Sequence, residues 1–158
     1  MRPYLDKAAP AAWKSASAHS AVIAQEAERL GLSAQESELI KVRVSQLNGC
    51  AFCLDLHSRE ARSAGITPQK LDLLPAWRES ALYGDRERAV LAIAEAATRL
   101  PVSEEQKADL SGAEHVLGED AFVAAEWVAL TINMFNRISI LSDHPVRQRE
   151  ADGSLTRR

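Results

Sequence analysis

The sequence predicts an all-α protein, and three observations support this fold class. Apolar residues recur at the spacing of amphipathic helices along nearly the whole chain. Alternating runs of Val, Ile, Thr and aromatic residues, which are typical of strands, are missing from the sequence. Residues that begin and end helices stand between the apolar segments. With 158 residues, the chain is expected to form a single domain whose core needs neither disulfides nor metal ions.

The first predicted helix begins at Pro10, because proline suits the first helical turn, and ends before Gly31. Its inward face is expected to contain Trp13, Val22, Ile23 and Leu30.

A second helix is predicted over residues 34–47. Ser33, followed three residues later by Glu36, forms a capping-box pattern at its start, and Asn48-Gly49 ends it. The residues expected to form most of its buried side are Leu39, Ile40, Val42 and Leu47.

A third helix is predicted over residues 50–64, closed by Gly65. Thr67-Pro68 then begins a short helical segment that ends near Pro75.

The second half of the chain contains three further predicted helices. Asp85 is a suitable N-cap for residues 86–100, and a capping box at Ser103 begins a helix over residues 104–117. The last helix, over residues 120–142, is the most apolar. We therefore divide the chain into a helical domain, residues 1–142, and a polar C-terminal tail, residues 143–158, which we expect to be mobile unless a neighbouring subunit holds it.

The last helix is apolar around most of its circumference, which predicts that it is buried. Glu126, Asn133 and Arg137 form a polar stripe along it. Because buried polar groups need partners, these three residues are expected to satisfy one another or backbone groups at a helix or subunit contact. A second interpretation places Arg137 near the thiol site described below, where its charge would stabilise a thiolate or bind an anionic substrate.

Charge and composition argue against several classes of partner. The chain has 19 Lys and Arg against 22 Asp and Glu, a formal net charge of −3, without a basic cluster. Nucleic acids and anionic membranes are therefore not expected as partners. The N-terminus lacks the apolar core of a signal peptide, and no stretch approaches the length of a membrane span. We expect a cytoplasmic protein.

The candidate catalytic residues lie in the segment from Glu38 to His57. Cys50, Cys53 and His57 are spaced by three and four residues, so on a helix their side chains share one face. Cysteines three apart on a helix have Cα atoms roughly 5 to 6 Å apart, which allows a disulfide to close. The turn at Asn48-Gly49 can bring Glu38 beside them, where its carboxylate would orient the imidazole.

A free thiol is mostly protonated at neutral pH, so a reactive cysteine needs a lowered pKa. The helix N-terminus favours a thiolate at Cys50 and Cys53, and His57 can accept the proton of Cys53, which is one turn away. Of these two effects, the imidazole is expected to lower the thiol pKa more than the helix N-terminus does. Cys53 is therefore expected to attack the substrate, whereas Cys50, nearer the helix entrance and solvent, would resolve the product and meet the reductant.

This pattern resembles the alkylhydroperoxidase AhpD core within the carboxymuconolactone decarboxylase superfamily. Similar segments follow at residues 77–80 and 133–137, so the resemblance covers roughly residues 15–141. It implies an AhpD-like helical bundle that assembles as a homo-trimer or homo-hexamer. It also implies a peroxidase without haem or flavin, in which Cys50 and Cys53 are the redox pair and Glu38 and His57 belong to a proton relay.

The resemblance further implies a hydroperoxide substrate and a small dithiol or a protein thiol as reductant. The sequence departs from it at one position. The peroxidases that it resembles carry an additional His immediately before the second cysteine, and this chain has Phe52 there.

Other interpretations of the same residues remain open. The cysteines can be small buried apolar residues, or they can bind zinc together with His57 and Glu38. A thioredoxin module is excluded because its Cys-x-x-Cys pair accompanies a βαβ pattern. The competing functions are a cofactor-free lactone decarboxylase or hydrolase that uses His57 and Glu38 as acid and base, and a redox-sensing oligomer. His19, His115 and His144 have no partner pattern and receive no role.

We predict that the protein is an obligate homo-oligomer, because its last helix is too apolar to leave a face in water. Light scattering at micromolar concentration should give a multiple of the chain mass. A mass near the 17.3 kDa of one chain would contradict this prediction.

Overall fold

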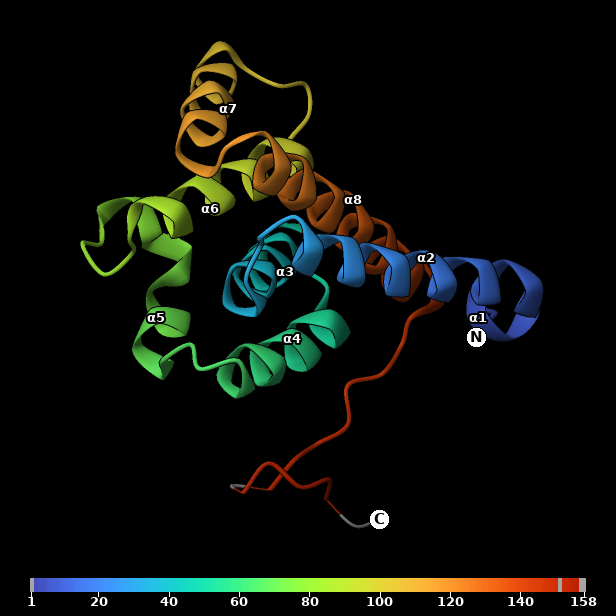
Figure 1. Ribbon diagram of the computed structural model, residues 1–158. Helices are drawn as coiled ribbons and strands as arrows, with labels where there is room; N and C mark the ends of the chain where they lie inside the picture. The colour runs from blue at the N-terminus through green and yellow to red at the C-terminus, as the bar shows by residue number, and fades with distance from the viewer. Residues whose placement is uncertain (1, 151, 157–158) are drawn as a thin grey trace.

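The computed structural model describes residues 2–150 and 152–156, and helices make up its body (Figure 1). The α-helices are α1 (Leu5–Ala8), α2 (Pro10–Arg29), α3 (Ala34–Asn48), α4 (Ala51–Ser63), α5 (Pro68–Leu73), α6 (Asp85–Thr98), α7 (Glu104–Leu117) and α8 (Glu119–Ser142). A 3₁₀ helix, η1 (Leu74–Glu79), follows α5. Over the described ranges, the extended pairing is limited to one bridge between Arg149 and Leu155. The predicted all-α class is confirmed.

Local hydrogen bonds explain why most helices begin where the sequence predicts. The Ser33 hydroxyl accepts from the Glu36 N–H at 3.1 Å, and the Glu36 carboxylate accepts from the Ser33 N–H at 2.8 Å. Ser103 and Gln106 form the same capping box at α7. These bonds satisfy N–H groups that the first turn of a helix leaves unpaired, which confirms both predicted starts.

The structure differs from the prediction at α1 and at both ends of α6, and several other helix ends differ by a single residue. The short helix α1 was not expected. Gly84, not Asp85, caps α6, because the Glu87 carboxylate accepts from the Gly84 N–H at 2.8 Å and the helix therefore starts one residue earlier. Helix α6 also ends at Thr98, two residues early, since the residues just before Pro101 are disfavoured from continuing a helix.

Helix α3 lies at the centre of the molecule and packs against α4, α6 and α8 (Figure 1). Leu39, Ile40 and Val42 are buried as predicted, and they meet apolar side chains of α6 and α8 in one continuous core. The prediction for α2 is partly wrong. Val22 is exposed, and Trp13 is only partly covered, because α2 packs chiefly on α8 and keeps one face in solvent.

The prediction that α8 is buried all round is wrong for the single chain. Its inner face packs against α2, α3 and α6, and Val128 and Ile132 are buried there. The described part of the chain leaves its outer face largely exposed, with the Trp127 ring in edge contact with His19 at 5.8 Å. The exposed large apolar residues on this helix are Val123, Trp127, Leu130, Ile140 and Leu141.

The chain leaves α8 at Asp143 and continues as a tail that folds back on itself beyond α4 (Figure 1). Arg149 of this tail donates to the Asp55 carboxylate of α4 at 3.2 to 3.4 Å. That contact lowers the pKa of Asp55, with the hydrogen bond from Arg149 as the main cause. In the part of the chain that is described, no helix is both long and apolar enough to cross a membrane.

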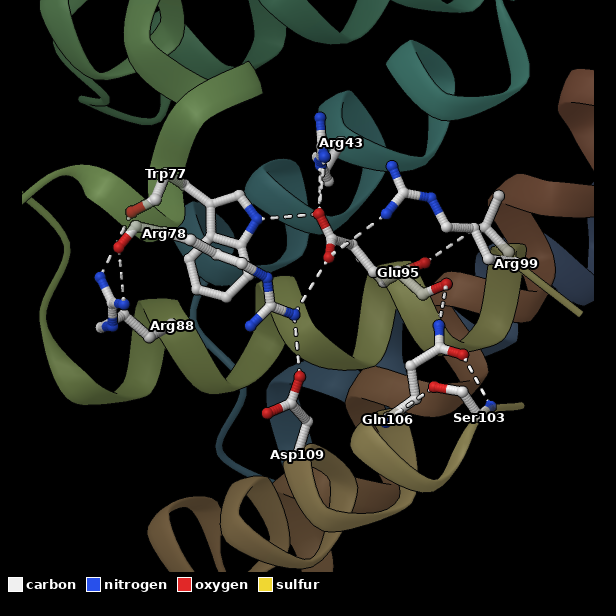
Figure 2. A network of polar contacts seen from close by, with 11 residues as sticks. Arg43, Trp77, Arg78, Arg88, Glu95, Arg99, Ser103, Gln106 and Asp109 are labelled. Carbon is white, nitrogen blue, oxygen red and sulfur yellow. Dashed lines mark hydrogen bonds and ion pairs between the residues drawn. The ribbon is translucent and has the colours of Figure 1, made fainter.

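A buried carboxylate ties η1 to α3 and α6 (Figure 2). Glu95 of α6 accepts from Arg43 at 2.6 and 3.0 Å and from the Trp77 indole at 2.9 Å. Arg78 adds a bond at 3.1 Å and continues to Asp109 of α7 at 2.8 Å. Trp77 and Arg78, which belong to the segment 77–80 noted in the sequence, thus take part in a structural ion network.

We predict that Glu95→Gln lowers the free energy of unfolding by about 3 kcal/mol, because it leaves the charge of the buried Arg43 without its partner. Urea unfolding measures this change. Glu60→Gln, at an exposed position on α4, is the control and should change the free energy by less than about 0.5 kcal/mol.

The same variant should alter the response to acid. Burial raises the pKa of Glu95, but hydrogen bonds from Trp77 and Arg43 and the charge of Arg43 outweigh burial and hold it below its ordinary value. Its stabilisation is therefore complete above the pKa of an unfolded glutamate, about 4.3, and is lost as the pH falls through the folded value. If the native protein and Glu95→Gln lose stability in parallel below about pH 4, the network does not have this role.

Candidate active site

The tight turn between α3 and α4 places both cysteines. Gly49 adopts the left-handed conformation, with φ 65°, which glycine takes without strain. The Cys50 N–H then donates back to the Ser45 carbonyl at 3.0 Å. As a result α4 starts beside the end of α3, and Cys50 becomes its N-cap.

Hydrogen bonds to α8 hold this turn in place. The Asn48 side-chain amide donates to the side-chain oxygens of Asn133 and Asn136, both at 2.9 Å. Asn136 in turn donates to the Ser45 hydroxyl at 3.1 Å. Since Asn136 and Ser45 are fully buried, each polar group here depends on the others.

Cys50 lies behind the reactive face, not at its entrance. The Cys53 N–H donates to the Cys50 sulfur at 3.4 Å, and the Cys50 side chain is 2% exposed. Burial, together with the hydrogen bond that it shares with the Cys53 side chain, raises the pKa of Cys50 to about 12. Two predictions for Cys50 are therefore wrong. Cys50 is not near solvent. Its pKa is also not lowered, because the effect of burial outweighs the hydrogen bond from the Cys53 N–H at the helix N-terminus.

Cys53 lies in the wall of a cavity and is 4% exposed. Its sulfur is 3.6 Å from the Ser139 hydroxyl of α8. Ser139 has no signal in the sequence, because 86 residues separate it from Cys53.

Glu38 and His57 are paired as the sequence predicts. His57 Nδ1 is 3.0 Å from one Glu38 oxygen, and Lys41 Nζ is 2.7 Å from the other. Burial raises the pKa of Glu38, but the hydrogen bond to His57 and the charge of Lys41 outweigh it and lower the pKa overall. An ionised Glu38 accepts the Nδ1 hydrogen, so the Nε2 atom of a neutral His57 has a free lone pair.

The side chains that meet at one cavity of about 1060 Å³ between α2, α3, α4 and α8 are Glu38, Lys41, Cys53, His57 and Ser139. Cys53, His57 and Glu38 stand in its wall, and no hydrogen bond joins His57 to Cys53 in the described residues. A proton passing between them would therefore use a bound molecule. The apolar residues of the wall are Trp13, Ile23, Ala24, Ala27, Leu32, Ala34, Phe52, Leu56, Val128, Ile132 and Phe135.

This volume is at the upper end of the range for small-molecule sites, and the wall combines a mainly apolar lining with a few polar groups. Trp13 and Phe52 on its lining are 37% and 40% exposed, so the cavity reaches solvent. Zinc gains no support, because the described residues contain no group of three or more His, Cys, Asp or Glu placed to hold a metal ion.

The family of the chain follows from comparison with known proteins. The model of the carboxymuconolactone decarboxylase family matches residues 10–96, more than half of the chain and all of the segment from Glu38 to His57. The chain belongs to this family. The resemblance to AhpD-like members, which rests on Glu38, Cys50, Cys53 and His57, is thereby confirmed at the level of the superfamily.

Two relatives of the chain are uncharacterised proteins. YdfG of Bacillus subtilis (strain 168) is 40% identical over 103 residues, which are 65% of this chain and 70% of YdfG. YnjA of Escherichia coli (strain K12) is 34% identical over 76 residues, 48% of this chain and 42% of YnjA.

Solved structures share the fold. The crystal structure of ATU0492 from Agrobacterium tumefaciens, a protein of unknown function whose name connects it with AhpD and antioxidant defence, has a TM-score of 0.78 and 31% identity over 92% of this chain and 98% of its own. The debrominase Bmp8, in its apo form, has a TM-score of 0.62 and 23% identity over 74% of this chain and 61% of its own, which shows the fold alone.

In this chain, Asn133 and Arg137 of the polar stripe on α8 have a structural role. Arg137 is exposed, donates to the Asn133 side chain at 2.7 Å and to its carbonyl at 2.9 Å, and is not among the residues that line the cavity. Asn133 also donates to Thr98 at 3.0 Å. The interpretation in which these groups satisfy one another holds for Asn133 and Arg137, and the placement of Arg137 at the thiol site is wrong.

We predict that the two thiols differ in reactivity, because only Cys53 faces the cavity while burial raises the pKa of Cys50 to about 12. With iodoacetamide at neutral pH, Cys50→Ser, which retains Cys53, should be alkylated at least about tenfold faster than Cys53→Ser. Equal rates, or a faster reaction at Cys50, would contradict this order.

Proposed function

We propose that this protein is a thiol-dependent peroxidase that reduces organic hydroperoxides through Cys50 and Cys53. One observation carries the proposal. A cysteine with a second cysteine directly behind it stands in the wall of a large, mainly apolar cavity, beside a Glu–His pair. Membership in the family and the likeness to ATU0492 support a peroxidase-like role.

The first step takes place at Cys53. Its thiolate attacks the terminal oxygen of the hydroperoxide, so that an S–O bond forms and the O–O bond breaks. The electron pair of that bond leaves with the alkoxide, which takes up a proton and becomes an alcohol. Cys53 is oxidised to a sulfenic acid, and the hydroperoxide is reduced by two electrons.

In this proposal, His57 accepts the proton that the Cys53 thiol loses, and Glu38 stabilises the protonated ring. The free Nε2 atom of His57 accepts that proton through a water or substrate molecule in the cavity, because the two side chains do not bond directly. The carboxylate of Glu38 orients the ring and stabilises the imidazolium that forms. Lys41 keeps Glu38 in its ionised form.

The second step closes the disulfide. The Cys50 thiol attacks the sulfur of the sulfenic acid, so that an S–S bond forms and the S–O bond breaks. The oxygen leaves as hydroxide and becomes water by taking up the proton that Cys50 loses. Once the sulfur next to it has been oxidised, Cys50 needs no movement of the backbone to reach it, since their side chains are already in contact.

Reduction of the disulfide restores the two thiols. Because Cys50 and Cys53 are 2% and 4% exposed, a protein surface cannot touch either sulfur without opening the fold. A small dithiol that enters the cavity can reach Cys53, so we favour it over a protein thiol as reductant.

One observation favours a second candidate function. The Glu38–His57 pair lies in the cavity wall without a bond to Cys53, so it can act as acid and base on a bound substrate without the thiols. That arrangement suits a cofactor-free decarboxylase or hydrolase. Such an activity would survive in a Cys50→Ala/Cys53→Ala variant, whereas peroxidase activity would not.

We predict that one equivalent of tert-butyl hydroperoxide consumes two thiols per reduced chain and yields one equivalent of tert-butanol. Cys53→Ser should produce no alcohol. Cys50→Ser should produce the alcohol and retain a sulfenic acid that a dimedone trap labels on Cys53. His57→Gln should react about 100-fold more slowly with both thiols intact.

The outcomes separate the alternatives. If both thiols survive excess hydroperoxide in the native protein, the peroxidase proposal is wrong. If the sulfenic-acid label appears only on Cys50 in Cys53→Ser, the roles of the two cysteines must be exchanged. A disulfide that forms in one turnover, changes the oligomeric state and supports no further turnover with added dithiol would indicate a redox sensor.

A further inference from the structure

His144 stands directly after α8, in the wall of the same cavity as Cys53. Asp143, the C-cap of α8, has φ 56°, and the chain turns there so that the His144 N–H donates to the Ser139 carbonyl at 3.1 Å. The hydroxyl of Ser139 contacts the Cys53 sulfur. His144 is therefore attached to the turn of α8 that meets the reactive cysteine.

Asp6 of α1 orients the His144 ring. The Nε2 atom is 3.3 Å from the Asp6 carboxylate, the side chains are 14% and 15% exposed, and both residues line the cavity. Burial raises the pKa of Asp6, but the hydrogen bond from His144 and the charge of Lys7 outweigh it and lower the pKa overall. Because an ionised carboxylate only accepts, Nε2 carries a hydrogen.

The other ring nitrogen of His144, Nδ1, is buried and has no hydrogen-bond partner among the described residues. The ring lies between Tyr4, with centroids 5.1 Å apart, and Phe52, with centroids 5.4 Å apart. A buried polar atom without a partner calls for an explanation.

The Phe52 ring lies against the His144 ring, and both residues line the cavity. The Phe52 side chain is 40% exposed, so it can change rotamer without disturbing the core. For a bound molecule to reach Nδ1 the Phe52 ring would move aside, and the cavity that would hold such a molecule also has Cys53 in its wall.

We propose that His144, oriented by Asp6, is a second acid–base group of the cavity and protonates the oxygen that leaves a bound hydroperoxide. The proposal rests on the peroxidase function proposed above. His144 is the catalytic residue, since it touches the leaving oxygen, and Asp6 is a positioning residue.

The proton and electrons balance as follows. In the imidazolium form of His144, Nδ1 also carries a hydrogen. As the Cys53 sulfur bonds to the terminal oxygen and the O–O bond breaks, the electron pair leaves with the inner oxygen, and the Nδ1 hydrogen passes to that oxygen. The alcohol forms, and the neutral ring regains, through water in the cavity, the proton that Cys53 gave to His57.

The test compares two oxidants that differ in their leaving group. Tert-butyl hydroperoxide releases a strongly basic alkoxide that needs a proton, whereas peracetic acid releases acetate, which does not. In single-turnover oxidation of the reduced full chain, His144→Gln should slow the reaction with tert-butyl hydroperoxide about 10- to 100-fold. The reaction with peracetic acid should slow by less than about threefold.

Asp6→Asn tests the same step with the ring retained, and it should slow the hydroperoxide reaction by a smaller factor with the same selectivity. His115→Gln, at an exposed position on α7, is the matched control and should leave both rates unchanged. Equal losses with both oxidants in both variants would assign His144 and Asp6 a structural role only and overturn the proposal, as would no loss with either. A native protein that reacts with peracetic acid but with no hydroperoxide would overturn the proposed function itself.

Discussion

The hydrogen bonds between Asn48 and α8 fix the geometry on which the cavity and its thiols depend. Asn48 is the last residue of α3, and its amide is held by Asn133 and Asn136 directly before the chain reverses at Gly49. This attachment decides where α4 begins, and therefore where Cys50 and Cys53 lie relative to Ser139. The cavity between α2, α3, α4 and α8 follows from it, because α4 forms the wall that carries Cys53, Phe52 and His57.

Burial then separates two cysteines that share one helix end. Each pKa unit corresponds to about 1.4 kcal/mol, and burial raises the pKa of Cys50 from an ordinary 9.0 to about 12. A helix N-terminus contributes only about 0.3 to 1 kcal/mol in the other direction. Cys50 is thus kept protonated behind Cys53, which alone opens to the cavity. The pair is suited to an ordered reaction, with attack from the cavity side and resolution from the protein side.

Features set by neighbouring residues could be predicted from the sequence. The capping boxes at Ser33 and Ser103, and the glycine that ends α3, depend on contacts over a few residues, as does the approach of Glu38 to His57 through one short turn. Three features depend on how α8 packs against segments that are distant in the sequence. They are the burial of Cys50, the contact of Ser139 with Cys53 and the contact of Asp6 with His144. Asp6 and His144 are 138 residues apart, and no local pattern encodes such a contact. The outer face of α8 shows the same limit, since its apolar pattern predicts burial but does not say against what.

The crystal structure of the protein after treatment with one equivalent of an organic hydroperoxide tests the central claim most directly. The expected result is a disulfide between Cys50 and Cys53, with the Glu38–His57 pair still in place and the Asn48 turn unchanged. Two unmodified thiols, or oxygen bound to Cys50 with Cys53 untouched, would contradict the assignment of Cys53 as the reacting sulfur and of the pair as a redox centre.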